Sequence, residues 1–356
     1  MTNIQQLAAI SGVSVATVSR ALNGSAEVSE ATRRKILALA EELDYTPSAA
    51  ARTLVQRRSH VVGVILDTGP GHPDLLHPFF QQVLVGLKDG AGARGYDLLL
   101  FASDEPGHGF GGTHSYLRRA GHHGVDGTIV MGYDGSDAEI VKLAASGLPC
   151  IAVDAVIPGP RTGYVMSENR EGAMLAVRHL LELGHERIAT ITGTLQTKPG
   201  ADRLEGYRDQ LAHAGLEPRD EYVVKGDFYD ESGYRGTRQL LELREPPSAI
   251  FAASDLMAAG ALRAANELGA NVPADLALVG FDDISLASLL QPQLTTIRQD
   301  MQALGEAAAE GLSRMIEDRD AEPVKRFVPT RLVVRASSGA NGAPRGQTRS
   351  ITKEVR

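Results

Sequence analysis

The sequence predicts a multidomain fold in which a small all-α segment precedes a larger α/β core of two doubly wound lobes. From residue 61 onward, short apolar runs alternate with amphipathic helical patterns, as in parallel sheets covered by helices on both faces. The first sixty residues show only short helical patterns. The core spans some 275 residues, which exceeds one ordinary doubly wound unit and favours two lobes with a cleft between them.

Each of the three N-terminal helical patterns follows a residue that can cap a helix: Thr2, which forms a capping-box pattern with Gln5, then Ser14 and Ser29. The expected ends lie near Ser11–Gly12, Asn23–Gly24 and Leu43. Two short helices joined by a glycine turn and supported by a third form a helix-turn-helix arrangement.

The second of these helices would enter the major groove of DNA. Arg20 can pair bidentately with guanine, small apolar side chains can touch a thymine methyl group, and hydroxyl groups can hold phosphates. The candidate DNA contacts are Ser14, Val15, Ala16, Thr17, Ser19, Arg20 and Asn23. Spacing alone leaves a small helical bundle without a DNA role as an equal alternative.

The net charge is unevenly divided along the chain. The whole chain carries −8, which alone would argue against nucleic-acid binding. Residues 1–60 contain seven Lys and Arg against five Asp and Glu, whereas residues 61–335 contain 25 against 38. The acidic charge therefore belongs to the core, and the segment before it is mildly basic.

The motifs themselves resemble the lactose/galactose repressor (LacI/GalR) family over about residues 2–335. In the headpiece the matching segments are Gly12–Asn23, Val28–Arg33, Leu43–Pro47 and Ala51–Leu54. In the core they include Pro78–Phe80, Val125–Gly127, Asn169–Gly172, Arg203–Tyr207, Val279–Asp283 and Leu294–Gln299.

This resemblance implies a helix-turn-helix headpiece over 1–46, a hinge helix over 47–58 and a periplasmic-binding-protein-like core over 59–335. Lobe one would comprise about 61–165 and 297–320, and lobe two about 166–290 and 321–335. Residues 336–356 are expected to be a disordered tail. In the family the hinge inserts a leucine, here Leu54, into the minor groove, with Arg52 as a phosphate contact.

Ligands of open α/β sheets bind beyond the carboxyl ends of the strands. Asp154 and Asp282 follow two predicted strands, and Arg203 opens the helix after another. Carboxylates accept hydrogen bonds from pairs of hydroxyl groups, and Arg donates two in parallel. With the resemblance carried over, the expected effector contacts are Phe79, Phe80, Asp154, Arg203, Phe228, Ser254 and Asp282. The alternatives are a helix cap at Asp282 and a surface ion pair at Arg203.

Three positions in these regions depart from the family pattern and bear on which effector binds. His77 and Ser254 stand where the family usually has Asn, and Glu168 stands where Asp is usual.

The resemblance implies a transcriptional regulator, usually a repressor, that acts as a homodimer on a palindromic operator. Its effector would be a sugar or sugar derivative, with a nucleoside or purine as the alternative. A solute-binding receptor without a DNA role is the competing interpretation, which the core alone would allow.

No nucleophile with a base partner, metal-ligand set or paired-acid motif is evident, so we expect no catalysis, no cofactor and no metal. No secretory signal or spanning apolar run is evident, and we expect a cytoplasmic protein without membrane contact.

Overall fold

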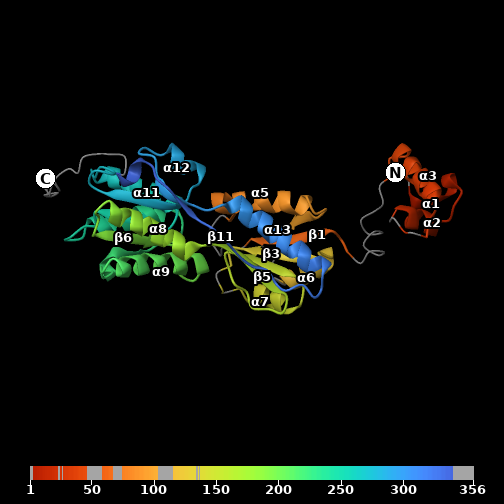
Figure 1. Ribbon diagram of the computed structural model, residues 1–356, viewed down its shortest axis with the longest axis horizontal. Helices are drawn as coiled ribbons and strands as arrows, with labels where there is room; N and C mark the ends of the chain where they lie inside the picture. The colour runs from red at the N-terminus through yellow and green to blue at the C-terminus, as the bar shows by residue number, and fades with distance from the viewer. Residues whose placement is uncertain are drawn as a thin grey trace. The chain divides into compact units, whose positions relative to one another are not determined.

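The computed structural model describes residues 3–22, 25, 27–45, 58–66, 74–102, 115–133, 135 and 137–339. The chain divides into two compact units, a headpiece, Met1–His60, and a core, Val61–Arg356. Their helices and strands are shown in Figure 1. Three predicted DNA contacts, Asn23, Arg52 and Leu54, and all of the predicted hinge except Arg58 lie outside the described residues.

The headpiece contains three helices, α1 (Ile4–Ser11), α2 (Val15–Leu22) and α3 (Glu30–Glu42). One large apolar side chain from each, Leu7, Val18 and Ile36, is fully buried in their shared core. This arrangement confirms the predicted helix-turn-helix.

The caps of the second and third helices are also as predicted, because Ser14 and Ser29 accept hydrogen bonds from the amides of Thr17 and Thr32. The first capping box is one residue later than predicted. Asn3 and Gln6 form it rather than Thr2 and Gln5. Asn caps a helix at least as well as Thr, and the prediction overlooked it.

The core contains two six-stranded sheets within the described residues. The sheet of lobe one has the order β11-β5-β4-β3-β1-β2, with every pair parallel. Its strands are β1 (Val61–Leu66), β2 (Asp97–Leu100), β3 (Gly127–Met131), β4 (Cys150–Val153), β5 (Thr162–Ser167) and β11 (Lys325–Val328). Its helices are α5 (Pro78–Gly92), α6 (Tyr116–His123), α7 (Ala138–Ala145) and α13 (Met301–Glu317), with a short 3₁₀ turn, η1 (Asp74–Leu76).

The sheet of lobe two has the order β12-β10-β9-β8-β6-β7, and only the edge pair β10–β12 is antiparallel. Its strands are β6 (Ile188–Thr192), β7 (Val223–Lys225), β8 (Ala249–Ala252), β9 (Ala277–Asp282), β10 (Thr295–Arg298) and β12 (Arg331–Val333). Its helices are α8 (Asn169–Glu182), α9 (Lys198–His213), α10 (Asp230–Leu241), α11 (Asp255–Glu267) and α12 (Ser285–Leu289), with 3₁₀ turns η3 (Asp220–Tyr222) and η4 (Ala336–Ser338). The two-lobe α/β fold is therefore as predicted.

The chain passes between the lobes three times, after β5, after β10 and after β11. The predicted lobe boundaries near the last two passages were wrong. All of β10 lies in lobe two, and β11 lies in lobe one although residues 321–335 were assigned to lobe two. Three of the four β11 residues are exposed, so this charged edge strand lacks the apolar run by which buried strands are recognised.

The predicted disordered tail also starts too early. Residues 336–338 form η4, in which Ser337 and Ser338 are buried. Any tail can begin only after Gly339, the last described residue.

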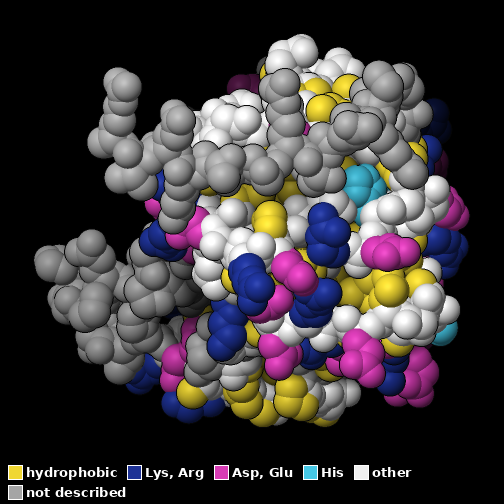
Figure 2. Space-filling model, turned by 90° about the vertical axis from the view of Figure 1, so that its left-hand side faces the viewer, with side chains coloured by type: hydrophobic (Ala, Val, Ile, Leu, Met, Phe, Trp, Pro, Cys, Tyr) yellow, Lys and Arg dark blue, Asp and Glu magenta, His cyan; other side chains and the backbone are white. Residues whose placement is uncertain are grey.

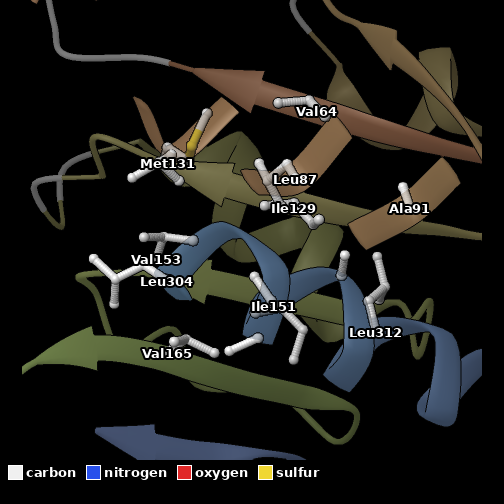
Figure 3. Packing of buried hydrophobic residues seen from close by; sticks show 14 of the residues in the cluster. Val64, Leu87, Ala91, Ile129, Met131, Ile151, Val153, Val165, Leu304 and Leu312 are labelled. Atoms are coloured by element: carbon white, nitrogen blue, oxygen red, sulfur yellow. The ribbon is translucent and has the colours of Figure 1, made fainter. Parts of the chain in front are cut away.

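Helices α5 and α13 pack together on the sheet of lobe one. Figure 3 shows Leu87 of α5 and Leu304 and Leu312 of α13 among apolar side chains of the strands. A Cβ on Gly86 would overlap the backbone carbonyl of Gln302, and one on Gly305 would overlap the carbonyl of Val83. The missing side chains let the two helix backbones touch, so α5 and α13 form one rigid pair.

Gly86→Ala should destabilise the core by roughly 1–3 kcal/mol, because the added methyl group cannot fit between two backbones. The matched control is Gly92→Ala at the end of the same helix, where a Cβ would meet nothing within 4 Å. That change should be neutral or stabilising by up to about 1 kcal/mol. Thermal unfolding followed by far-UV circular dichroism checks both variants, and equal melting temperatures would contradict the close approach.

Candidate functional site

Three predicted site residues meet at the carboxyl ends of the strands. Asp154 directly follows β4 in lobe one, Asp282 ends β9 in lobe two, and Arg203 lies in the second turn of α9. Their exposed fractions are 9%, 3% and 4%. The alternatives of a surface ion pair at Arg203 and a helix cap at Asp282 are therefore wrong, since α12 has no side-chain cap.

A chain of hydrogen bonds and one ion pair connects these residues across the two lobes. Arg203 Nε donates to Asn169 Oδ1 at 2.8 Å, and Asn169 Nδ2 lies 3.5 Å from Asp154 Oδ1. On the other side, Arg203 Nη1 lies 3.6 Å from Asp282 Oδ1, which accepts a hydrogen bond from Gln299 Nε2 at 2.6 Å. Because Asn169 begins α8 and Gln299 follows β10, the first and second crossovers are both part of this network.

The Arg203 guanidinium is fixed from several sides. It stacks on the ring of Phe281 at 3.7 Å from the centroid and lies 5.5 Å from that of Phe228. Its Nη1 also donates to the carbonyl of Ala253 at 2.6 Å. A cation held this way is preorganised to orient a ligand rather than to move toward one.

The buried carboxylates of the site hold protons unusually well. Burial raises the pKa of Asp154 to about 6, an effect that the nearby Arg203 opposes. Burial likewise raises the pKa of Asp282 to about 6, again against Arg203. Burial and then the Asp282 carboxylate raise the pKa of Asp255, which accepts hydrogen bonds from Thr296 and from the amide of Ile284. Three buried carboxyl groups thus surround one guanidinium, and Asp255 is a member that sequence reasoning missed.

The backbone is strained at the same place. Among non-glycine residues in the described core, positive φ angles occur at Asp154 (55°), Phe228 (74°), Asp282 (120°) and Asp283 (58°). Left-handed backbone is unfavourable for these residues and persists only where the surrounding structure enforces it. Its concentration around one cluster supports a functional role for that cluster.

Ser254 supports the site instead of facing a ligand. Its side chain is fully buried, donates to the carbonyl of Phe228 at 2.8 Å and caps α11 by accepting from the amide of Met257. On the opposite side, the ring of Phe228 lies against Gly193, where any Cβ would overlap it. Ser254 and Gly193 therefore position Phe228.

The two predicted aromatic contacts of lobe one have different environments. Phe79 is buried in the apolar cluster of lobe one, whereas Phe80 is partly buried, with its ring 5.2 Å from that of Phe79. Phe80 also lies 5.7 Å from the ring of His77. Phe80 can therefore line the site, while Phe79 supports it from the core.

His77 is a further residue that the predicted set lacked. It caps α5 by accepting from the amide of Phe79 at Nδ1, and its ring meets that of Tyr229 in lobe two at 5.3 Å. Burial lowers the pKa of His77 to about 4, so the ring is neutral at neutral pH. With Nδ1 accepting, the proton is on Nε2, which is buried. An interaction of the ring with the backbone of Phe228 in lobe two partly offsets the effect of burial on the pKa of His77. The departure from the usual Asn was the sequence signal for this position.

Two polar atoms near the cluster, Gln299 Oε1 and Ser167 Oγ, are buried without a hydrogen-bond partner. Ser167 borders Asp154, because its amide donates to Asp154 Oδ1 at 3.1 Å. Buried polar groups are nearly always paired, so these two atoms are candidates to meet a ligand.

The candidate DNA contacts that are described lie on the outer side of α2. Ser14, Val15, Ala16 and Arg20 are exposed, and Thr17 and Ser19 are partly buried. Arg20 forms an exposed ion pair with Glu27 at 3.3 Å, which it must exchange for any DNA contact. No group of three or more His, Cys, Asp and Glu in the described ranges is placed to hold a metal ion. No helix among the same residues is long and apolar enough to cross a membrane.

Known proteins resemble the chain along nearly its whole length. The family model for bacterial regulatory proteins of the lacI family matches residues 3–48, and the one for the periplasmic binding protein-like domain matches 177–338. The transcriptional regulator CelR of Thermobifida fusca is 36% identical over 336 residues, or 94% of this chain and 97% of that protein. The chain belongs to the lacI family. The ribose operon repressor of Halalkalibacterium halodurans, 35% identical, covers 95% of this chain and 97% of its own length.

Solved structures of this family share the same arrangement. The lac repressor dimer bound to operator and the anti-inducer ONPF has a TM-score of 0.79 and 28% identity, covering 95% of this chain and 99% of its own. The CelR–cellobiose complex has a TM-score of 0.71 and 32% identity, covering 95% and 100%. As a lacI-family member, the protein is a DNA-binding transcriptional regulator and not an enzyme. The matched headpiece favours this function over a receptor without a DNA role.

The raised pKa of Asp154 makes a prediction about stability. Below the ordinary pKa of 3.8 the carboxyl group is protonated in both the folded and the unfolded protein. The stability that comes from holding this proton in the folded protein is lost as the pH rises through about 6. From about pH 4 to about pH 7, wild type should therefore lose roughly 3 kcal/mol of unfolding free energy relative to Asp154→Asn. Chemical denaturation followed by circular dichroism across this range checks the value.

Asp209→Asn is the control for this experiment. A hydrogen bond from Arg170 holds the pKa of Asp209 below its ordinary value. The stability that Asp209 contributes is therefore lost only when the pH falls through this lowered pKa, below the range tested. The difference between wild type and Asp209→Asn should stay flat over the same pH range. A flat profile for Asp154→Asn as well would show that the Asp154 carboxyl is not buried as described.

Proposed function

We propose that this lacI-family regulator binds a sugar or sugar derivative between its two lobes and that the ligand controls its affinity for operator DNA. The cluster of Asp154, Arg203 and Asp282, linked by the hydrogen bonds of Asn169 and by one ion pair, carries this proposal. Through the contact of Asn169 with Asp154 it joins both lobes at the carboxyl ends of their strands, where open α/β sheets bind ligands.

The chemistry of the cluster fits hydroxyl groups. Carboxylates accept hydrogen bonds from adjacent hydroxyl groups, and Gln299 Oε1 and Ser167 Oγ are buried polar atoms near them without a hydrogen-bond partner. Phe80 and Phe228 supply apolar surface for the face of a sugar ring. Arg203 is the only Lys or Arg side chain in the described network, and it already faces Asp282. The site therefore suits an uncharged ligand better than an anionic one. A nucleoside or purine, stacked on Phe228, is the alternative.

On DNA we propose a homodimer that acts as a repressor at a palindromic operator, with α2 of each headpiece in the major groove. The hinge would place Leu54 in the minor groove and Arg52 on the backbone. Residues 1–60 carry a net charge of only +2, so one headpiece contributes little non-specific attraction. Tight binding then requires two headpieces, and we expect the protein to act in the cytoplasm, where the DNA is.

A thermal-shift panel of ribose, glucose, cellobiose, adenosine and hypoxanthine tests the ligand class. A sugar at 100 times its dissociation constant should stabilise the full-length protein by about 2.7 kcal/mol. Asp282→Asn should weaken that sugar by roughly tenfold to a hundredfold, because a hydrogen bond to a charged group contributes about 1.5–3 kcal/mol. The exposed Asp209→Asn should bind it as wild type does. Stabilisation by adenosine or hypoxanthine alone would favour the alternative ligand class, and an unchanged sugar affinity in Asp282→Asn would place the ligand elsewhere.

Selection from random-sequence DNA with the full-length protein tests the DNA function. The enriched sites should be palindromic. Arg20→Ala should lose about 1–3 kcal/mol of discrimination at one base pair of each half-site. Arg34→Ala, at an exposed position of α3, should leave the preferred sequence unchanged. Enrichment of sites without two-fold symmetry would contradict the dimer, and equal sequence preferences for wild type and Arg20→Ala would contradict the role of α2.

A further inference from the structure

Asp283, the neighbour of Asp282, is held by two arginines that come from different parts of the chain. Its side chain is only 4% exposed, and its backbone φ is 58°. Arg335 Nη2 donates to Asp283 Oδ1 at 2.6 Å, and Arg298 Nε donates to the other oxygen, Oδ2. One carboxylate therefore binds two guanidinium groups.

Arg298 is the last residue of β10, where the chain leaves lobe two for lobe one. The next residue, Gln299, donates to Asp282, and Asp300 then caps α13. Two successive crossover residues thus bind two successive carboxylates of the turn after β9. A shift of Asp282 therefore acts on Gln299, and only Asp300 lies between Gln299 and the first residue of α13.

Arg335 follows β12, after the chain has returned to lobe two for the last time. Its Nη1 donates to the carbonyl of Leu294 at 2.7 Å, and its amide donates to Thr295 Oγ1 at 2.9 Å. Next along the chain, Ser337 Oγ donates to the carbonyl of Leu278 at 2.6 Å, and Ser338 lies 2.9 Å from both Thr295 and His179. The segment 335–338 is thereby tied to β9, β10 and α8.

We propose that Asp283 is a positioning residue that couples the effector site to the second crossover through Arg298 and to the segment 335–338 through Arg335. The term effector site rests on the proposed function; the coupling itself concerns residues of this chain in the absence of ligand.

The packing gives this coupling a physical route. A ligand that binds Asp282 shifts the adjacent Asp283, and the two arginines carry that shift to both sides of the turn. On one side α13 begins, and its close contact with α5 through Gly86 and Gly305 makes the pair move as one body. His77 precedes α5 and contacts Tyr229 of lobe two. Movement of the α5–α13 pair therefore changes the angle between the lobes.

Hydrogen exchange of the ligand-free, full-length protein tests the two arms of the coupling. Arg298→Gln should increase exchange at least tenfold at residues 299–304 and leave 335–339 protected. Arg335→Gln should do the reverse, and Asp283→Asn should expose both segments. The control is Arg326→Gln on β11, which breaks an exposed ion pair with Glu310 of α13, beyond residues 299–304, and should change neither segment. The Arg298 side chain is 40% exposed, and its replacement leaves Asp283 paired with Arg335. Arg298→Gln should therefore fold even if Asp283→Asn does not.

A double-mutant cycle distinguishes coupling from a local structural role. Asp282 makes no hydrogen bond with 335–338, yet Asp282→Asn should raise exchange there in a wild-type background and add nothing in an Asp283→Asn background. Additive effects would overturn the proposal, as would exchange that rises equally throughout lobe two in every variant. Both readouts are independent of which compound stabilises the protein, so failure of the ligand panel and failure of this proposal are separate results.

Discussion

The burial of the Arg203 guanidinium is the constraint on which the rest of the core depends. A charge removed from water is unfavourable unless hydrogen bonds and opposite charges replace the lost hydration. Here the partners come from α8 (Asn169), from the loop after β8 (Ala253) and from the end of β9 (Asp282), while Phe281 packs against the flat face. All of these elements belong to lobe two, so the guanidinium fixes the carboxyl end of that sheet, and Asn169 extends the network to Asp154 of lobe one.

The same arrangement leaves the site with more carboxyl groups than its one cation can balance. Burial disfavours the charged forms of Asp154, Asp255 and Asp282, and their pKa values rise accordingly. Hydroxyl donors of an uncharged ligand would stabilise these ionised carboxylates without adding a competing negative charge. The burial that disfavours these carboxylates therefore favours a ligand that donates several hydroxyl hydrogen bonds. The strained backbone at Asp154, Phe228 and Asp282 also indicates a binding site, because such strain is concentrated at functional sites.

Much of this could be predicted from sequence because the signals are local or follow a general rule. Helix caps and glycine turns indicated the headpiece, and the strand-end rule brought Asp154, Arg203 and Asp282 together. The edge strands β11 and β12 could not be found this way, since both are short, β11 is largely exposed and no residue of β12 is fully buried. The structural role of Ser254 could not be found either, because its hydroxyl donates to a carbonyl 26 residues away. The same holds for the contact of His77 with Tyr229 across the lobes. The first contact depends on the packing of lobe two and the second on the crossovers between the lobes, and no local pattern encodes either.

The distribution of charge explains why sensing and DNA binding occupy separate units. Figure 2 shows Lys and Arg side chains interspersed with Asp and Glu on the face of lobe two that is turned to the viewer. Exposed pairs such as Arg170–Asp209 and Arg263–Glu231 have the same character. A mixed surface on a core with an excess of 13 acidic residues offers DNA no positive field, so attraction must come from the headpieces. Because each headpiece is only weakly basic, affinity depends on placing two of them at once. A small change in the angle between lobes can then have a large effect on DNA binding without any change in the residues that contact bases.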